Sequence, residues 1–565
     1  MSGLTGLILL LVLPLFGAAA VAVSAPRQAK MLALATTFLP LGIFAGMAGM
    51  FNWAGGAADD PAFGASFTWF EPLGLRFSLG LDTVSMLLVG LTVLLGPICV
   101  AASFTAITER VRTYYFWLLV LQTAMTGVFA ARDVVVFYIF FEFTLVPLYI
   151  LINLWGSTNR KAAATKFFLY TFTGSLVTLA GLVFVAYRHA QNNPWTFDFA
   201  ALADTCSNLP LHEQGLVFWA LMCGFAVKVP LFPVHTWLPL AHTEAPTAGS
   251  VILAGVLLKL GTYGLYKFAL NMCPAAAIHF APVVGVLAVI GIIYAGLICW
   301  VQRDVKKLVA YSSVSHLGFC VLGLFALNSI GLTGSILYMI NHGLSTGALF
   351  LLIGMIYERY HTRSLKELGG LASKMPIWAS FMVFFAMASV GLPGLNGFVS
   401  EFMCLFAAFQ ADSFHWQKAG GGLLDGATPG ELGPWFAFFA GLGMIVTAIY
   451  LLYMVGAIVW GPLKTPHDDH GHGHDAKHGH DGHGVLPTDL NFREISILAP
   501  LAILCVVLGL YPRPLLKVLE APTQQMSQML DAERRDNPYL NRSPEGLAST
   551  PAASTSTPVA ADAGH

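Results

Sequence analysis

Residues 215–230 read Gly-Leu-Val-Phe-Trp-Ala-Leu-Met-Cys-Gly-Phe-Ala-Val-Lys-Val-Pro, an apolar run that ends in one lysine and a proline. A Lys side chain at the middle of a lipid bilayer costs about 2.5–3.5 kcal/mol on insertion scales. Pro230 and Pro233 each lack the backbone N–H that a continuing helix needs. Because a buried cation beside a broken helix is unfavourable on both counts, we expect Lys228 to serve the function of the protein.

The composition of the whole chain is that of an integral membrane protein. Its 565 residues are 56% hydrophobic and only 10% charged, whereas a soluble domain has about 25% charged residues. The formal net charge of −1 gives no basic field for nucleic acid. Most of the eight cysteines lie in apolar runs and read as small buried hydrophobes. Cys206 and Cys273 fall in loops, where a disulfide between them is possible but not expected.

The apolar runs are too long for membrane strands and lack a two-residue alternation, so they predict helices. We predict an all-α polytopic membrane protein with about fourteen transmembrane helices. The first has no basic residue before it, so we expect a retained helix rather than a signal peptide. The predicted segments are residues 2–24, 31–52, 77–103, 114–130, 133–154, 164–187, 215–238, 246–270, 278–302, 309–327, 331–357, 377–411, 434–460 and 495–516.

Two sets of five helices, segments 4–8 and 9–13, predict an inverted repeat, because an odd number of crossings reverses the second set. Segment 7 breaks at Pro230, and segment 12 breaks within residues 391–397; each is the fourth helix of its set. Paired broken helices in an inverted repeat indicate a transport path, and chance placement of Gly and Pro is the alternative. The predicted organisation is helices 1–3 in residues 1–113, a first repeat in 114–270, a second repeat in 278–460, a His-rich cytoplasmic loop in 461–494, a last helix in 495–516 and a disordered tail in 517–565.

Basic residues set the predicted orientation. Odd-numbered loops hold seventeen Lys and Arg residues, and even-numbered loops hold five. Loops rich in Lys and Arg stay on the cytoplasmic side. We therefore predict that the odd loops face the cytoplasm, or the matrix of a mitochondrion, and that both termini lie outside.

Six ionisable side chains fall at membrane depth. Structural pairing or a misplaced helix end could explain any one of them, but the set would cost on the order of 15 kcal/mol unpaired, which is similar to the whole stability of a protein. Acid, amine and imidazole groups each bind and release one proton, as a relay requires, whereas two lysines would repel a metal cation. The six are Glu142, Lys228, Lys259, His316, His342 and Glu401.

Glu142 and Lys228 are the natural candidates for a switching pair. A nearby carboxylate stabilises the charged form of an amine, so separating the two would change the protonation of Lys228. The sequence does not show whether they touch.

Four stretches resemble the antiporter-like, proton-pumping subunits of respiratory complex I, over roughly residues 80–460. They resemble the family's seventh-helix and eighth-helix motifs and the pattern that follows them. The stretches are Lys228-Val-Pro-Leu-Phe-Pro-Val-His-Thr-Trp-Leu-Pro, residues 241–261 around Lys259, Asp304-Val-Lys-Lys-Leu-Val-Ala-Tyr-Ser-Ser-Val-Ser-His316-Leu-Gly and Asn341-His342-Gly-Leu.

Glu401 narrows this resemblance. Most related subunits, including those of cation/proton antiporters, carry Lys on the twelfth helix, whereas the branch called subunit M, or chain 4, carries Glu. The chain is therefore similar to subunit M. It departs from bacterial relatives at Leu240, where they usually have Asp, and this puts in doubt a carboxylate role at that position.

The resemblance implies a proton-translocating subunit of NADH:quinone oxidoreductase, which couples redox chemistry elsewhere in the complex to pumping. Glu142 and Lys228 would form the gating pair, Lys259, His316 and His342 the central relay, and Glu401 its end. FMN and Fe–S clusters would belong to other subunits, and we expect no cofactor or metal in this chain. Neighbouring antiporter-like subunits and lipids would be its partners, with no nucleic acid. A bacterial inner membrane is the implied location, with the mitochondrial inner membrane as the alternative.

Other features leave alternatives open. Residues 467–483 hold seven His residues and could bind Zn, Ni or Cu, but their Gly spacing favours a solvated linker. Asp82 suits a helix cap or interface anchor better than a proton path, and His235 and His242 suit structural hydrogen bonds. A sodium/proton antiporter subunit and a metal carrier are the competing functions; Glu401 argues against the first and the lysines against the second.

Overall fold

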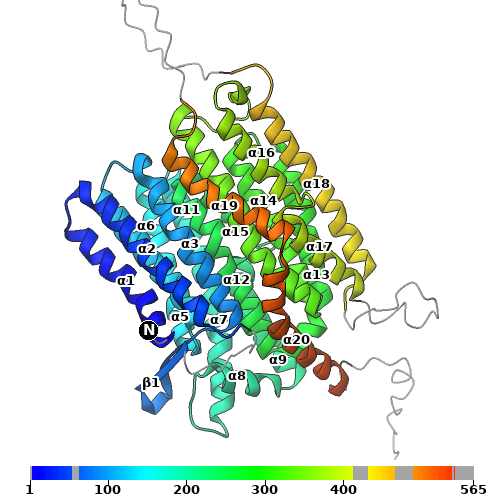
Figure 1. Ribbon diagram of the computed structural model, residues 1–565. Coiled ribbons are helices and arrows are strands. Elements are labelled where there is room, and N and C mark those ends of the chain that lie inside the picture. The colour runs from blue at the N-terminus through cyan, green and yellow to red at the C-terminus, as the bar shows by residue number, and fades with distance from the viewer. Residues whose placement is uncertain (1–2, 54–62, 412–430, 465–487, 538–539, 541–565) are drawn as a thin grey trace, which may run out of the picture.

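The computed structural model describes residues 3–53, 63–411, 431–464, 488–537 and 540. Its first part contains α1 (Gly3–Val23), α2 (Pro26–Met50), the strands β1 (Gly64–Phe70) and β2 (Leu75–Gly80), α3 (Thr83–Ala106) and α4 (Val111–Ala130). The helices pack side by side into one bundle, and the hairpin and α8 (Phe199–Ser207) lie at its lower end in Figure 1.

The segments that carry the candidate residues follow. The first group is α5 (Val134–Phe143), α6 (Leu145–Trp155), α7 (Arg160–Ala190), α9 (Leu211–Lys228), α10 (Leu238–Glu244), α11 (Thr247–Ile252), the π-helical η3 (Leu253–Leu257), α12 (Leu258–Gly264) and the π-helical η4 (Leu265–Leu270). The second group is α13 (Pro274–Val301), α14 (Val305–Phe325), α15 (Ser329–Tyr360), α16 (Pro376–Val390), α17 (Asn396–Gln410) and α18 (Pro434–Val459). The chain closes with α19 (Phe492–Leu510) and α20 (Arg513–Asp536).

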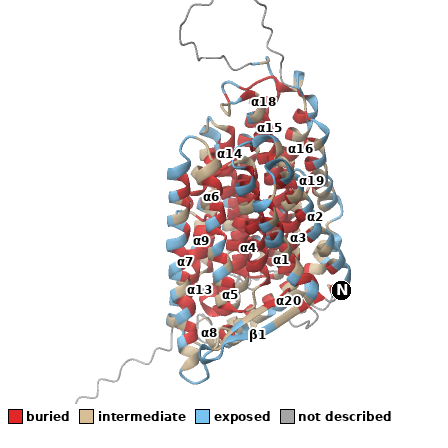
Figure 2. Cartoon of the chain, turned by 90° about the vertical axis from the view of Figure 1, so that its left-hand side faces the viewer, coloured by how far each residue is buried: buried red, intermediate tan, exposed pale blue. Residues whose placement is uncertain are grey.

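The helical membrane architecture is confirmed. In the described ranges, eleven helices are long and apolar enough to cross a membrane, and the shorter apolar α16 adds to them. The count of fourteen stays a prediction. The core runs along α11, α14 and α15, whose side chains are almost all buried, whereas α2, α7 and α13 expose apolar side chains outward (Figure 2). This pattern suits a bundle whose outer helices face lipid.

Both predicted helix breaks are present. α9 ends at Lys228, and helical geometry resumes only at Leu238, because Pro230 and Pro233 supply no N–H. α16 ends at Val390, and the next residue, Gly391, has a φ of +82°, a left-handed conformation that favours glycine. A side chain at Gly391 would also approach within 2.6 Å of an oxygen of Glu401.

The segment expected as one helix over 133–154 is confirmed as one membrane-spanning length, Val134–Trp155. Only Thr144 separates α5 from α6, and it keeps helical dihedral angles (φ −62°, ψ −25°). Pro147 contributes to this interruption, because it has no N–H to donate to the carbonyl of Phe143. The hydroxyl of Thr144 donates to the carbonyl of Phe141, 2.7 Å away.

One expectation needs correction, and one element of the fold was not predicted. The tail predicted as disordered from residue 517 is helical to Asp536, because Leu519, Met526 and Leu530 recur on one face of α20 and are buried against the bundle. The fold also contains a two-stranded antiparallel hairpin, β1–β2, which the apolar pattern does not signal.

Asp82 is a helix cap, as expected: its carboxylate accepts from Ser85 N at 2.8 Å.

Candidate functional site

Lys228 is the last residue of α9 and is 3% exposed. Its ammonium lies 3.4 Å from the hydroxyl of Thr144 and 4.3 Å from the ring centroid of Phe141. The indole N–H of Trp237 donates to the carbonyl of Val227 at 2.9 Å, so a side chain satisfies part of the broken end of the helix.

Glu142 lies two residues before Thr144 in the sequence. Among the described residues no Glu142–Lys228 ion pair shorter than 4.0 Å is present, and the Oε1 atom of Glu142 is buried without a hydrogen-bond partner. The two charges nevertheless act on each other electrostatically. The proposed pair is therefore open, with Thr144 in contact with the lysine.

Lys259 lies on α12 between two π-helical stretches and is fully buried. Its ammonium donates to the carbonyl of Ala254 and lies 2.7 Å from Nδ1 of His342. Gly343 makes this contact possible, because a side chain there would meet the carbonyl of Gly255 at 2.9 Å. α15 can thus approach η3 closely enough for His342 to reach the lysine.

His316 on α14 continues the line. Its ring centroid is 5.9 Å from that of His342. Its Nδ1 lies 2.8 Å from the hydroxyl of Tyr338 and 3.2 Å from Oε1 of Glu401. Tyr338 in turn donates to the same carboxylate oxygen at 2.5 Å. Tyr450 lies 3.4 Å from the second nitrogen of His316.

A small cavity of about 10 Å³ opens between His316, His342 and Glu401, about the room that one water centre needs. Four of its lining residues carry a buried polar atom without a hydrogen-bond partner. Unpartnered buried polar atoms are rare in proteins and indicate water or a transferable proton. The four atoms are Nε2 of His342, Oδ1 of Asn341, Oγ of Ser389 and Oε2 of Glu401.

Of the six predicted residues, the structure joins Lys259, His342, His316 and Glu401 into one line of contacts. Glu142 and Lys228 form a second cluster, linked to the first because α9 packs on α12. Sequence reasoning missed Tyr338 and Thr144. Tyr338 lies one turn before His342 on the same face of α15, and that spacing could have drawn attention to it.

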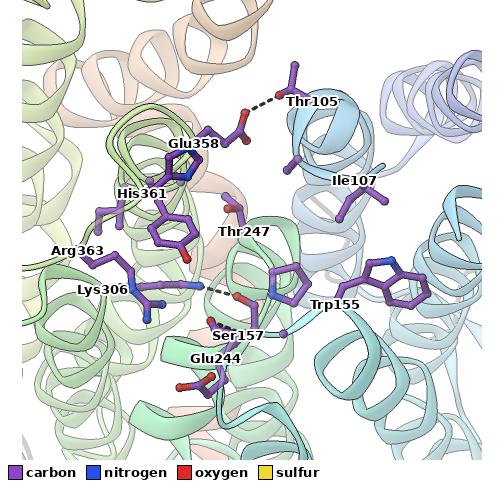
Figure 3. Close-up of a pocket in the computed structure, with 17 residues that line it drawn as sticks. Thr105, Ile107, Trp155, Ser157, Glu244, Thr247, Lys306, Glu358, His361 and Arg363 are labelled. Atoms are coloured by element: carbon purple, nitrogen blue, oxygen red, sulfur yellow. Dashed lines mark hydrogen bonds between the residues drawn. The ribbon is translucent and has the colours of Figure 1, made fainter. Parts of the chain in front are cut away.

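A cavity of about 520 Å³ lies at the ends of α3, α6, α11, α14 and α15. Figure 3 shows Lys306 and Arg363 on one side of it, facing Ser157 and Trp155. The ammonium of Lys306 donates to the carbonyl of Ala245 at 2.5 Å, and only 7% of this residue is exposed.

His242 on α10 is fully buried. Its ring stacks on Phe350 at a centroid distance of 4.6 Å, and both ring nitrogens lack a hydrogen-bond partner. The imidazole is electrostatically coupled to both Lys306 and Lys259. The structural hydrogen bond expected for His242 is absent from the described contacts of its ring.

Within the described residues, no group of three or more His, Cys, Asp or Glu side chains is placed to hold a metal ion. The His-rich stretch 467–483 lies outside the described residues.

Comparison with known proteins adds independent information. The family model described as NADH:quinone oxidoreductase/Mrp antiporter, TM, matches residues 131–421. The NADH-quinone oxidoreductase subunit M of Rhodobacter capsulatus is 39% identical over 522 residues, which cover 88% of this chain and 92% of that protein. Subunit M of Rickettsia bellii is 37% identical, over 81% of this chain and 85% of that protein. The NADH-ubiquinone oxidoreductase chain 4 of Marchantia polymorpha is 36% identical, over 93% and 97%.

Solved structures agree. A chain of respiratory complex I from Thermus thermophilus with bound NADH superposes with a TM-score of 0.78 at 26% identity, covering 93% of this chain and 99% of that one. A chain of the Mrp complex from Dietzia sp. gives a TM-score of 0.73 at 22% identity, covering 94% of this chain and 100% of that one, which shows a shared fold. The chain therefore belongs to the NADH:quinone oxidoreductase/Mrp antiporter family of membrane subunits, and its curated relatives lie on the subunit M branch.

Proposed function

We propose that this chain moves protons through Lys259, His342, His316, Tyr338 and Glu401, as the membrane subunit M of a proton-translocating NADH:quinone oxidoreductase. The observation that carries the proposal is the series of contacts from Lys259 to Glu401 in an apolar interior, in which a water-sized cavity spans the one step without a direct hydrogen bond, between His342 and His316. Each member accepts one proton and releases one, and each lies within direct or one-water reach of the next.

The geometry supports proton transfer along the relay in either direction. The ammonium of Lys259 donates toward Nδ1 of His342, and the water-sized cavity bridges the ring of His342 to that of His316. The hydroxyl of Tyr338 faces both His316 and Glu401, so it can accept from the imidazole while it donates to the carboxylate. The other oxygen of Glu401 is free of partners and available for onward transfer.

Glu142 and Lys228 act as the gate in this proposal. Lys228 now contacts Thr144 rather than Glu142. Closing the Glu142–Lys228 pair would hold the positive charge on Lys228, and opening it would release a proton toward Lys259. Because Thr144 lies at the junction of α5 and α6, two residues after Glu142, a small rotation at this junction would change which of the two side chains faces the lysine.

Proton uptake is proposed at the large cavity of Figure 3. It lies where the odd-numbered loops end, which is the predicted cytoplasmic side. Lys306 lines it, and His242, with two unpartnered nitrogens, is coupled to both Lys306 and Lys259. The electrostatic interaction of this buried imidazole with a lysine that lines the cavity and with a lysine of the relay supports this route.

We propose that the chain lies in a bacterial inner membrane with both termini outside; the mitochondrial inner membrane is the alternative. Its proposed partners are the other membrane subunits of the complex, above all neighbouring antiporter-like subunits, and membrane lipids. The β1–β2 hairpin supports a protein contact, because Phe67, Trp69 and Phe70 are 60%, 58% and 49% exposed at the end of the bundle. FMN and Fe–S clusters are proposed to reside in those partner subunits.

Substitution of Lys259 by Met tests the relay in the assembled complex. Met keeps the length and apolar stem of the side chain but cannot carry a proton. We expect proton translocation, followed by quenching of a ΔpH dye in membrane vesicles, to be almost abolished while the complex still assembles. Lys166→Met is the matched control, because the contacts of Lys166, with the carbonyl of Thr236 and the ring of Tyr170, lie outside the relay. Normal pumping by Lys259→Met would contradict the relay.

Purification of the chain from mild detergent tests its assembly. Peripheral NADH-oxidising and Fe–S subunits should accompany it. Co-purification with antiporter subunits alone, together with sodium-dependent proton exchange, would instead favour the sodium/proton antiporter.

A further inference from the structure

Two buried thiols that the relay does not use meet at one end of the bundle. Cys206 lies in the last turn of α8, and Cys273 is the residue that precedes α13. Both are fully buried, and their sulfur atoms are 3.5 Å apart. No other pair of cysteine sulfurs is joined by a contact among the described residues, which contain all eight.

The surroundings hold this junction in place. Gln214 on α9 is fully buried and donates to the carbonyls of Cys206 and Ser207 at 3.3 and 3.2 Å. Its side-chain oxygen accepts from the N–H of Ala276 in α13 at 2.8 Å. The side-chain amide of Gln214 therefore links the backbone of α8 to the first turn of α13, where the two cysteines also meet. Only a small approach of the two sulfurs separates this contact from bonding distance.

Both cysteines belong to even-numbered loops, which the distribution of Lys and Arg places outside the cytoplasm. α8 also lies at the same end of the bundle as the β1–β2 hairpin, another even-numbered loop (Figure 1). Disulfides persist in the bacterial periplasm, whereas cytoplasmic thiols stay reduced.

We propose that Cys206 and Cys273 are a disulfide site, oxidised as the outer loops fold. The two thiols lose two protons and two electrons and form one S–S bond. The electrons pass to the disulfide of a dithiol oxidoreductase of the outer compartment, which is reduced to its dithiol by thiol–disulfide exchange. The exchange precedes the packing of α8, because both sulfurs are inaccessible in the folded chain.

The cross-link would enclose the part of the chain that carries the lysines of the gate and of the relay. Residues 207–272 contain α9, α10, α11 and α12, and hence Lys228 and Lys259. These helices are interrupted by the break after Lys228 and by two π-helical stretches. A covalent bond at the outer end fixes the start and the end of this interrupted segment to each other, while the gate between them stays free to move.

Differential alkylation of the intact complex tests the proposal. Cells are quenched in acid and the membranes denatured in excess N-ethylmaleimide without reductant, so that burial protects no thiol. Reduction and a second, isotope-distinct alkylation follow, and peptides are mapped by mass spectrometry. We expect Cys206 and Cys273 to carry mainly the second label, and Cys99, Cys320 and Cys505 to carry the first. First-label modification of both Cys206 and Cys273 would overturn the proposal.

Single Ser variants make the pairing specific. In Cys206→Ser, Cys273 should change from the second label to the first, and the reverse should hold in Cys273→Ser. Neither residue is in the relay, so both variants should retain proton pumping but lose it faster on heating. Unchanged second-label modification of the remaining cysteine would show a different partner and refute the pair. These outcomes are independent of the Lys259→Met result, so each proposal fails or stands by itself.

Discussion

Replacing Tyr338 by Phe removes a single oxygen atom from the relay and leaves the ring, and hence the packing of α15, in place. That hydroxyl donates to Oε1 of Glu401 at 2.5 Å and faces Nδ1 of His316 at 2.8 Å. Without it, the remaining direct link is the longer contact of 3.2 Å between His316 and Glu401. The substitution therefore isolates the contribution of one hydroxyl to proton transfer.

The magnitude follows from the strength of the lost bond. A hydrogen bond to a charged group contributes about 1.5–3 kcal/mol. At about 1.4 kcal/mol for each tenfold change in rate, the step between His316 and Glu401 should slow by about 10- to 140-fold. We expect coupled NADH oxidation and proton pumping in membrane vesicles to fall together, with the complex still assembled.

Two matched substitutions separate a relay role from a packing role. Tyr450→Phe removes a hydroxyl that lies 3.4 Å from the other nitrogen of His316, so its effect should be small. Tyr115→Phe removes a buried hydroxyl that has no hydrogen-bond partner and should be neutral. If Tyr338→Phe pumped like the unmodified complex, or if all three variants lost activity equally, the assignment of Tyr338 to the relay would be refuted.

Three further outcomes are expected. Lys228→Ala in an assembled complex should lose most proton pumping, because it removes the gate cation, and a normal ΔpH signal would contradict the gate. Arg359→Met should destabilise the chain by about 3–5 kcal/mol, because it leaves the carboxylate of Glu494, which Arg359 binds at 2.7 and 2.9 Å, buried and unpaired; the yield of assembled complex measures this, and Glu494→Gln in the same chain should restore part of it. Deletion of residues 467–483 should leave pumping near its normal rate if they form a linker, and a large loss that zinc restores would instead support a metal role.

Much of the site can be predicted from the sequence, because its signals are local. A Lys, Glu or His in an apolar run is visible in the sequence, as are the prolines after Lys228 and the glycines before Glu401. The residues that these groups contact cannot be recognised from the sequence. Glu142 is the charge expected to face Lys228, yet the contact found is with the hydroxyl of Thr144, two residues further along the same helical span. Tyr338 carries no charge and therefore gives no signal as an isolated residue.

The sequence by itself determined that the chain is a helical membrane protein, where two of its helices break and which ionisable groups lie at membrane depth. Hydropathy and the missing N–H of proline act within a few residues, so they can be read from the chain. The tertiary structure alone decided that Lys259 meets His342, 83 residues away, that Tyr338 joins His316 to Glu401 and that Cys206 meets Cys273. Such contacts depend on how far two helices approach and how each is rotated about its axis. Close packing fixes the distance and the rotation of the helices, as where Gly343 lets α15 approach the backbone of η3. The hydropathy of the sequence does not indicate these distances and rotations.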